Sequence, residues 1–131
     1  MSKILVVEDD PGLQRVLLSA LKNADHDVRA VNNGRDALRA VREDAPALVV
    51  TDIVMPDSDG LEVIRLLRAD HPRIRIIAMS GGGIICGTTY LEIARLLGAH
   101  AILRKPILPS DLVHAVGELL EPRDPVAAVA S

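Results

Sequence analysis

The chain has 131 residues, of which 49% are hydrophobic, so it can bury one core and disorder is not expected. Its net charge of −3 gives no electrostatic reason to expect nucleic-acid binding, and no apolar stretch approaches the length of a membrane span. The single cysteine, Cys86, excludes a disulfide within this sequence and fits a reducing cytoplasm.

Five short apolar runs along the chain predict β-strands. Most of them lack alternation, which is typical of strands covered by helices on both faces, whereas residues 27–31 alternate and predict an edge strand. Aliphatic residues recur every three or four positions after each run, which predicts five helices. The predicted strands are residues 3–8, 27–31, 47–52, 74–79 and 101–104. The helix markers are Leu13, Val16, Leu17 and Leu21, then Leu38 and Val41, then Leu61, Ile64 and Leu67, then Leu91, Ala94 and Leu97, and finally Leu112, Val116 and Leu119.

Residues that favour helix ends agree with this division of the chain. Asp10-Pro11 predicts an N-cap followed by proline at the first helical position, and Gly98 predicts a helix stop. Strands that alternate with helices imply a parallel α/β sheet with right-handed crossovers. We therefore expect one α/β domain over residues 1–121, a short tail at 122–131 and no output domain.

Acidic residues and one lysine stand at the ends of three predicted strands. Glu8 and Asp9 end the first, Asp52 ends the third, and Lys105 follows the fifth. The carboxyl ends of parallel strands share one edge of the sheet, where open α/β folds bind ligands. Three carboxylates there would repel one another unless a cation joined them or a proton neutralised one. Hard oxygen donors beside a lysine therefore indicate Mg²⁺ and a phosphoryl group.

Over residues 3–120 the chain resembles the receiver domains of bacterial two-component response regulators. The resemblance rests on four segments in order: residues 4–10, residues 52–60, Ser80 and Lys105-Pro106. It implies a flavodoxin-like (βα)5 fold with a parallel five-stranded sheet in the strand order 2-1-3-4-5. It also implies a signalling protein rather than an enzyme, one that catalyses only its own phosphoryl transfer and dephosphorylation.

The resemblance assigns roles to individual positions. It makes Asp52 the phosphoacceptor and implies Mg²⁺ as the cofactor, with Asp9 as the direct ligand and Glu8 acting through water. It also implies a cis peptide between Lys105 and the proline that follows. The remaining implied roles are a metal-binding backbone carbonyl at Val54, a phosphoryl-binding hydroxyl at Ser80 and a phosphate-pairing ammonium at Lys105.

The expected function is Mg²⁺-dependent acceptance of a phosphoryl group from a sensor histidine kinase, followed by phosphorylation-dependent binding of a protein partner. The partner would bind the face made by the fourth helix, fifth strand and fifth helix, with no nucleic acid and no membrane involved. One alternative is a phosphorelay shuttle that passes phosphate to a histidine phosphotransfer protein. Another is a pseudo-receiver binding module, against which the intact acidic set argues. A phosphohydrolase would want a second acid two residues after its nucleophile, where this chain has Val54.

Several residues have structural interpretations beside functional ones. Asp10 could be a ligand but is expected to be a helix cap, and Asp57 and Asp59 are expected to serve turns and caps. The four histidines lack ligand spacing and are interpreted as structural or surface residues.

Two departures from the family pattern concern how the signal is read out. Ile102 stands where the family often has a mobile aromatic residue. The glycine-rich segment 81–89 is either a tolerated insertion or a mobile loop that closes over the phosphate or presents Ile84 and Ile85 to a partner. We expect phosphorylation to order this segment.

Overall fold

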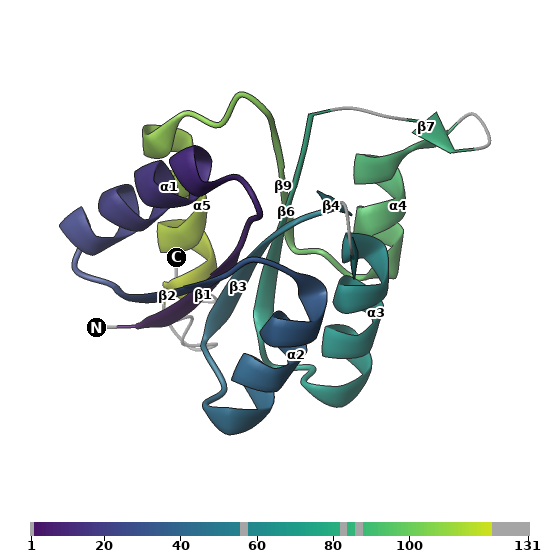
Figure 1. Ribbon diagram of the computed structural model, residues 1–131, viewed down its shortest axis with the longest axis horizontal. Helices are drawn as coiled ribbons and strands as arrows, with labels where there is room; N and C mark the ends of the chain where they lie inside the picture. The colour runs from purple at the N-terminus through teal and green to yellow at the C-terminus, as the bar shows by residue number, and fades with distance from the viewer. Residues whose placement is uncertain (1, 56–57, 82–83, 86–87, 122–131) are drawn as a thin grey trace, which may run out of the picture.

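The computed structural model describes residues 2–55, 58–81, 84–85 and 88–121. A parallel five-stranded sheet forms the middle layer, in the order β2-β1-β3-β6-β9, which is the predicted order 2-1-3-4-5 (Figure 1). Helices α1 and α5 cover one face, and α2, α3 and α4 cover the other. The sheet strands are β1 (Lys3–Val7), β2 (Asp27–Val31), β3 (Leu48–Asp52), β6 (Arg75–Ser80) and β9 (Ala101–Arg104).

The core is aliphatic and lies in two clusters, one on each face of the sheet. Alternate residues of a strand point to opposite faces. In β1, Leu5 and Val7 accordingly pack beneath α2, α3 and α4, while Ile4 and Val6 pack beneath α1 and α5. Because both faces are covered, a continuous apolar run is the pattern that such a strand requires.

The helices begin at side-chain caps that the sequence supplies. Asp10 accepts hydrogen bonds from Gly12 N and Leu13 N at the start of α1, as predicted. Asp59 accepts from Leu61 N and caps α3, in agreement with its predicted capping role. Gly98 ends α4 with φ of 116°, a conformation that glycine adopts without steric cost. The helices are α1 (Pro11–Asn23), α2 (Gly34–Glu43), α3 (Gly60–Asp70), α4 (Tyr90–Leu97) and α5 (Pro109–Leu120).

The structure differs from the sequence-based expectation at several places. Two short antiparallel hairpins were not predicted: β4 (Val54–Met55) pairs with β5 (Ser58–Asp59), and β7 (Ile84–Ile85) pairs with β8 (Thr88–Thr89). Val16 lies in the predicted helix, but it is 46% exposed and does not belong to the buried stripe of that helix. Strand ends differ by one residue, at 7 rather than 8 in β1 and at 80 rather than 79 in β6. Predictions for Asp57, Cys86, residues 82–83 and the tail 122–131 lie outside the described residues.

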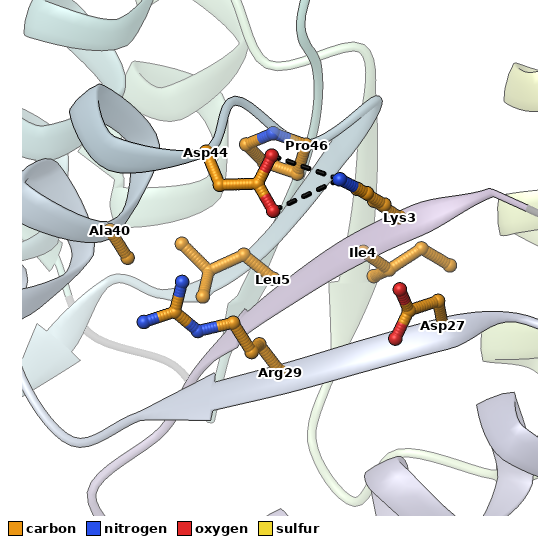
Figure 2. Close-up of a pocket in the computed structure, with 8 residues that line it drawn as sticks. All are labelled: Lys3, Ile4, Leu5, Asp27, Arg29, Ala40, Asp44 and Pro46. Atoms are coloured by element: carbon orange, nitrogen blue, oxygen red, sulfur yellow. Dashed lines mark hydrogen bonds and ion pairs between the residues drawn. The ribbon is translucent and has the colours of Figure 1, made fainter.

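A pocket opens at the edge of the sheet where β1 and β2 begin (Figure 2). Lys3 and Asp44 form an ion pair beside the pocket, in which both carboxylate oxygens of Asp44 lie 3.0 Å from the Lys3 ammonium. This pocket lies at the opposite end of the strands from the acidic cluster predicted above, so it is not part of that site. The pocket is lined by Lys3, Ile4, Leu5, Asp27, Arg29, Ala40, Asp44 and Pro46.

Among the described residues, no helix is long and apolar enough to cross a membrane.

Candidate functional site

Three charged side chains reach one point because of strand alternation. Glu8, Asp52 and Lys105 each follow, by two positions, a residue of the core cluster beneath α1 and α5. Backbone hydrogen bonds between neighbouring strands continue up to Glu8 and Lys105 and fix their positions. Glu8 N donates to Val31 O at 3.1 Å, and Lys105 N donates to Ser80 O at 2.9 Å. The three charged side chains therefore lie on the same side of the sheet as that core cluster, at the carboxyl ends of the strands. These preceding residues are Val6 and Val50, which are buried in that cluster, and Leu103, which is partly buried and packs against it.

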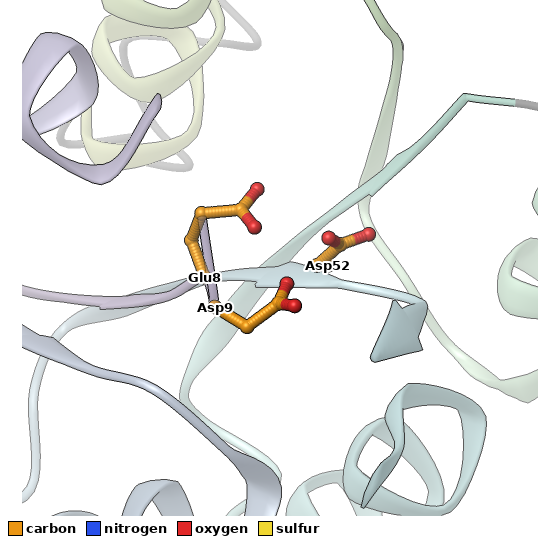
Figure 3. A group of neighbouring side chains, drawn as sticks. All are labelled: Glu8, Asp9 and Asp52. Atoms are coloured by element: carbon orange, nitrogen blue, oxygen red, sulfur yellow. The ribbon is translucent and has the colours of Figure 1, made fainter. Parts of the chain in front are cut away.

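The predicted acidic cluster forms. Glu8, Asp9 and Asp52 each offer a carboxylate oxygen, and these oxygens all lie within 4.8 Å of one another (Figure 3). Glu8 is fully buried and Asp52 is 3% exposed, whereas Asp9 lies open to solvent. Three anionic oxygens converging beside solvent are the hard donor set that suits Mg²⁺, which also retains water molecules. The residues present therefore fit such an ion.

Lys105 is shared between two of these carboxylates. Its Nζ donates to Asp52 Oδ2 at 2.7 Å and to Glu8 Oε1 at 3.0 Å. Burial by itself lowers the pKa of Lys105, but the hydrogen bonds to Asp52 and Glu8 outweigh it and the pKa is raised. The ammonium therefore stays charged, yet one positive charge faces three carboxylates, and the site as a whole attracts cations.

Burial disfavours the charged form of Glu8. Burial raises the pKa of Glu8 to about 6, against the hydrogen bonds from Asp10 N and Lys105 that lower it. The negative charge of Asp52 also raises this pKa. The Asp10 bond is 3.1 Å long and reaches Glu8 Oε2, so both carboxylate oxygens of Glu8 accept hydrogen bonds. The pairing of Glu8 with Lys105 was not foreseen in the sequence.

Ser80 and Val54 flank Asp52 on neighbouring segments. Asp52 pairs with Met79 across the sheet, so Ser80 is the next residue of β6 beyond that pair and is 1% exposed. Val54 follows β3 within β4, and its side chain is 55% exposed. All six residues singled out from the sequence thus belong to one end of the sheet or to the connections that leave it.

The backbone of Gly60 comes unusually close to the segment that follows β3. A Cβ atom at this position would lie 2.3 Å from Asp52 O and 2.5 Å from Ile53 Cα. Gly60 N also donates to Ile53 O at 2.9 Å, so α3 begins directly against the chain that carries Asp52. Glycine is required here by close approach of two backbones. The Asp59-Gly60 pair in the sequence could have indicated this contact, but it was interpreted only as a turn and cap.

The described histidine contacts agree with structural and surface roles. His100 Nδ1 accepts a 3.0 Å hydrogen bond from Ile76 N, and His100 N donates to Ile76 O at 2.8 Å, which ties the chain before β9 to β6. His114 Nε2 lies 2.8 Å from Glu118 Oε1 on the exposed side of α5. Neither histidine belongs to the acidic cluster.

Comparison with known proteins identifies the family to which this arrangement corresponds. The family model "Response regulator receiver domain" matches residues 4–117. The transcriptional regulator NtrC of Azospirillum brasilense is 36% identical over 126 residues, which are 96% of this chain and 26% of that protein. The receiver protein CpdR of Brucella abortus is 32% identical over 120 residues, which are 92% of this chain and 98% of that protein. The chain therefore spans about a quarter of the first relative and nearly the whole of the second.

Solved structures agree with the sequence comparison. The receiver domain of NtrX from Brucella abortus superposes with a TM-score of 0.82 at 29% identity, covering 92% of this chain and 99% of that domain. The chemotaxis regulator CheY4 of Vibrio cholerae superposes with a TM-score of 0.81 at 22% identity over 92% of this chain and 99% of that one, a likeness of fold alone. The arrangement of sheet and helices is thus that of known receiver domains.

Proposed function

This chain belongs to the response regulator receiver family of two-component systems, and from that premise we propose that it accepts a phosphoryl group on Asp52 in a Mg²⁺-dependent reaction. Receiver domains are signalling modules rather than enzymes with separate substrates. The observation that carries the proposal is the contact of Asp52 Oδ2 with the Lys105 ammonium at 2.7 Å, beside carboxylate oxygens of Glu8 and Asp9. This arrangement joins a nucleophile, a cation and a set of metal ligands.

The proposed step is an in-line displacement at phosphorus. A carboxylate oxygen of Asp52 forms a bond to phosphorus as the P–N bond of a phosphohistidine breaks. The electron pair of that bond stays on the imidazole nitrogen, which then takes up a proton. Lys105 offsets the repulsion between the carboxylate and the electron-rich phosphoryl oxygens, because its charge is already 2.7 Å from Asp52.

Mg²⁺ would be held by Asp9, Asp52 and the backbone carbonyl of Val54, with Glu8 acting through water. When bound, the ion neutralises negative charge on the transferring phosphoryl group. The proposal is supported by the three converging carboxylate oxygens and by the solvent exposure of Asp9, which leaves room for coordinated water. Glu8 is a poorer direct ligand than Asp9 because Asp10 N and Lys105 Nζ already occupy its oxygens.

Phosphorylation would change charge and hydrogen bonding at the carboxyl end of β3. An aspartyl phosphate carries about −1.5 to −2 charges where the carboxylate carried about −1, and it adds acceptor oxygens. Lys105 and the Ser80 hydroxyl are proposed to bind those oxygens, and Ser80 stands at the root of the segment that leads to α4. Thr89 pairs with Ile84 in the β7–β8 hairpin and also caps α4 through a 3.1 Å bond from Glu92 N. The hairpin and α4 therefore share Thr89, so a movement of one of them would reach the other.

The proposed partners are a sensor histidine kinase or a histidine phosphotransfer protein as donor, and a protein target for the phosphorylated form. The target would bind the face made by α4, β9 and α5. This choice of face is supported by the family resemblance. We further propose that residues 1–121 form the signalling domain and that residues 122–131 are a tail.

Intact mass spectrometry after treatment with acetyl phosphate and Mg²⁺ tests this function. The wild-type protein is expected to gain the mass of one phosphoryl group, and Asp52→Asn is expected to gain none. Asp70→Asn serves as the control, because Asp70 is an exposed residue at the end of α3. The proposal fails if Asp52→Asn is phosphorylated to the wild-type level or if the wild type is not phosphorylated at all.

A further inference from the structure

Gln14, a polar residue outside the acidic cluster, holds the segment on which Glu8 and Asp9 lie. Gln14 lies on α1 and is half-buried, and its Nε2 donates to Glu8 O at 3.0 Å and to Asn32 Oδ1 at 3.0 Å. A third acceptor, Val31 O, lies 3.4 Å away. An amide nitrogen carries two hydrogens, so the two short bonds use both, and Val31 O shares one of them.

The bond to Glu8 O matters because of where that carbonyl lies in the chain. It belongs to the peptide group that joins Glu8 to Asp9, and a peptide group is planar and rigid. A bond that fixes the carbonyl therefore also fixes the direction in which the backbone of Asp9 leaves β1. Asp9 is exposed, so packing does little to orient it, and the backbone sets where its carboxylate can reach.

The second short bond anchors Gln14 to another segment. Asn32 lies between β2 and α2, directly before Asn33, whose side chain accepts from Asp36 N and caps α2. The amide of Gln14 thus connects α1, the end of β1 and the β2–α2 connection. This three-way contact holds the Glu8–Asp9 peptide on the side of β1 that faces β2. Asp52 lies on the other side, at the end of β3, and there Lys105 holds the Glu8 carboxylate.

We propose that Gln14 is a positioning residue for the divalent cation, which it affects through the Glu8–Asp9 peptide without touching the metal. This inference rests on the proposed Mg²⁺-dependent function. Loss of the Gln14 amide should loosen Asp9 and weaken Mg²⁺ binding. The groups that react, Asp52 and Lys105, should remain in place. The expected signature is a higher Mg²⁺ requirement with little change in phosphorylation at saturating Mg²⁺.

The decisive variant is Gln14→Met, which keeps the length of the side chain and removes both donors. Mg²⁺ titration followed by the NMR shifts of the Asp9 and Asp52 amides should show a dissociation constant raised about fivefold, the factor expected for one hydrogen bond. Phosphorylation by acetyl phosphate should show the same increase in half-saturating Mg²⁺ and a plateau rate within about twofold of wild type, since the loss of one remote bond leaves the reacting groups intact. An unchanged dissociation constant would overturn the inference.

Two further variants separate positioning from general loss of stability. Leu21→Val removes a methylene from a fully buried residue of α1 and should lower stability while leaving Mg²⁺ affinity unchanged. Asn32→Ala removes the outer bond but leaves Glu8 O bound, so its effect should be smaller than that of Gln14→Met. Equal losses of affinity in all three variants would contradict the inference. The NMR titration needs no phosphorylation, so it tests Gln14 even if Asp52 proves not to be the phosphoacceptor.

Discussion

Gly60 offers a sharp test of how the segment carrying Asp52 is built. A Cβ atom there would lie 2.3 Å from Asp52 O and 2.5 Å from Ile53 Cα. Carbon atoms in ordinary contact lie about 3.5–4.0 Å apart, so the two backbones would have to separate by about 1 Å. Backbone atoms cannot rotate away as the end of a side chain can. The 2.9 Å bond from Gly60 N to Ile53 O would be stretched by the same movement.

The expected cost of Gly60→Ala is about 2–4 kcal/mol, from about 1–3 for overpacking and about 1 for the hydrogen bond. The same substitution at Gly117 is the matched control, because a Cβ atom there would meet nothing within 4 Å. Gly117 lies inside α5, where Ala is the better helix former, so Gly117→Ala should stabilise the protein by about 0.5–1 kcal/mol. The two variants should therefore differ from wild type in opposite directions.

Urea unfolding of the two alanine variants measures this difference, and acetyl phosphate labelling measures its effect on Asp52. Gly60→Ala should unfold at lower urea than wild type and should be phosphorylated more slowly, because Asp52 and Val54 move with the displaced backbone. Equal stability of Gly60→Ala and Gly117→Ala would refute the close approach as the reason for glycine. A destabilised Gly60→Ala with an unchanged phosphorylation rate would refute its link to the site.

Three further predictions concern the metal, pH and the readout. Asp9→Ala should weaken Mg²⁺ binding and slow phosphorylation together, and an unchanged affinity in a Mg²⁺ titration would remove Asp9 from the ligand set. Burial, with Arg68 and Arg75 nearby, lowers the pKa of His100 from its usual 6.5. The unfolded chain then binds the proton more tightly, so the His100 contribution is present above pH 6.5 and is lost as pH falls. Glu8, whose pKa is raised, has the opposite dependence in this range, so the informative quantity is the difference in unfolding free energy between wild type and His100→Asn. This difference should fall as the pH is lowered from 7 to 5, and a difference that stays constant in urea titrations would count against this assignment. Finally, beryllofluoride should slow hydrogen exchange at residues 84–85 and 88–89, and equal exchange with and without it would exclude ordering of that segment.

The functional residues could be predicted because parallel strands bring their carboxyl ends to one edge. Glu8, Asp52 and Lys105 are far apart in the chain, yet each stands at the end of an apolar run that forms a strand of the sheet, fully buried in β1 and β3 before the acids and half-buried at the β9 edge before Lys105. The strand order came from the family resemblance, since apolar runs do not specify which strands are neighbours. Asp10 and Asp59 were identified as caps because their bonds are local to the helix start.

The contacts that sequence reasoning missed depend on where the chain turns. Gln14 reaches Glu8 O and Asn32 only because α1 folds back over the end of β1, and helical periodicity gives no sign of it. Val16 follows the helical spacing but lies outside the covered stripe, because periodicity does not fix how wide that stripe is. The β7–β8 hairpin was missed because its strands have two residues each, too short for any alternation to be visible.

Mapping the phosphorylated residue tests the central claim most directly. Borohydride converts an aspartyl phosphate to homoserine, which peptide mass spectrometry can place in the sequence. After treatment with acetyl phosphate and Mg²⁺, homoserine should be found at position 52 and should be absent when Mg²⁺ is chelated. Homoserine at Asp9, or a phosphoryl group that borohydride does not remove, would contradict the proposal that Asp52 is the phosphoacceptor.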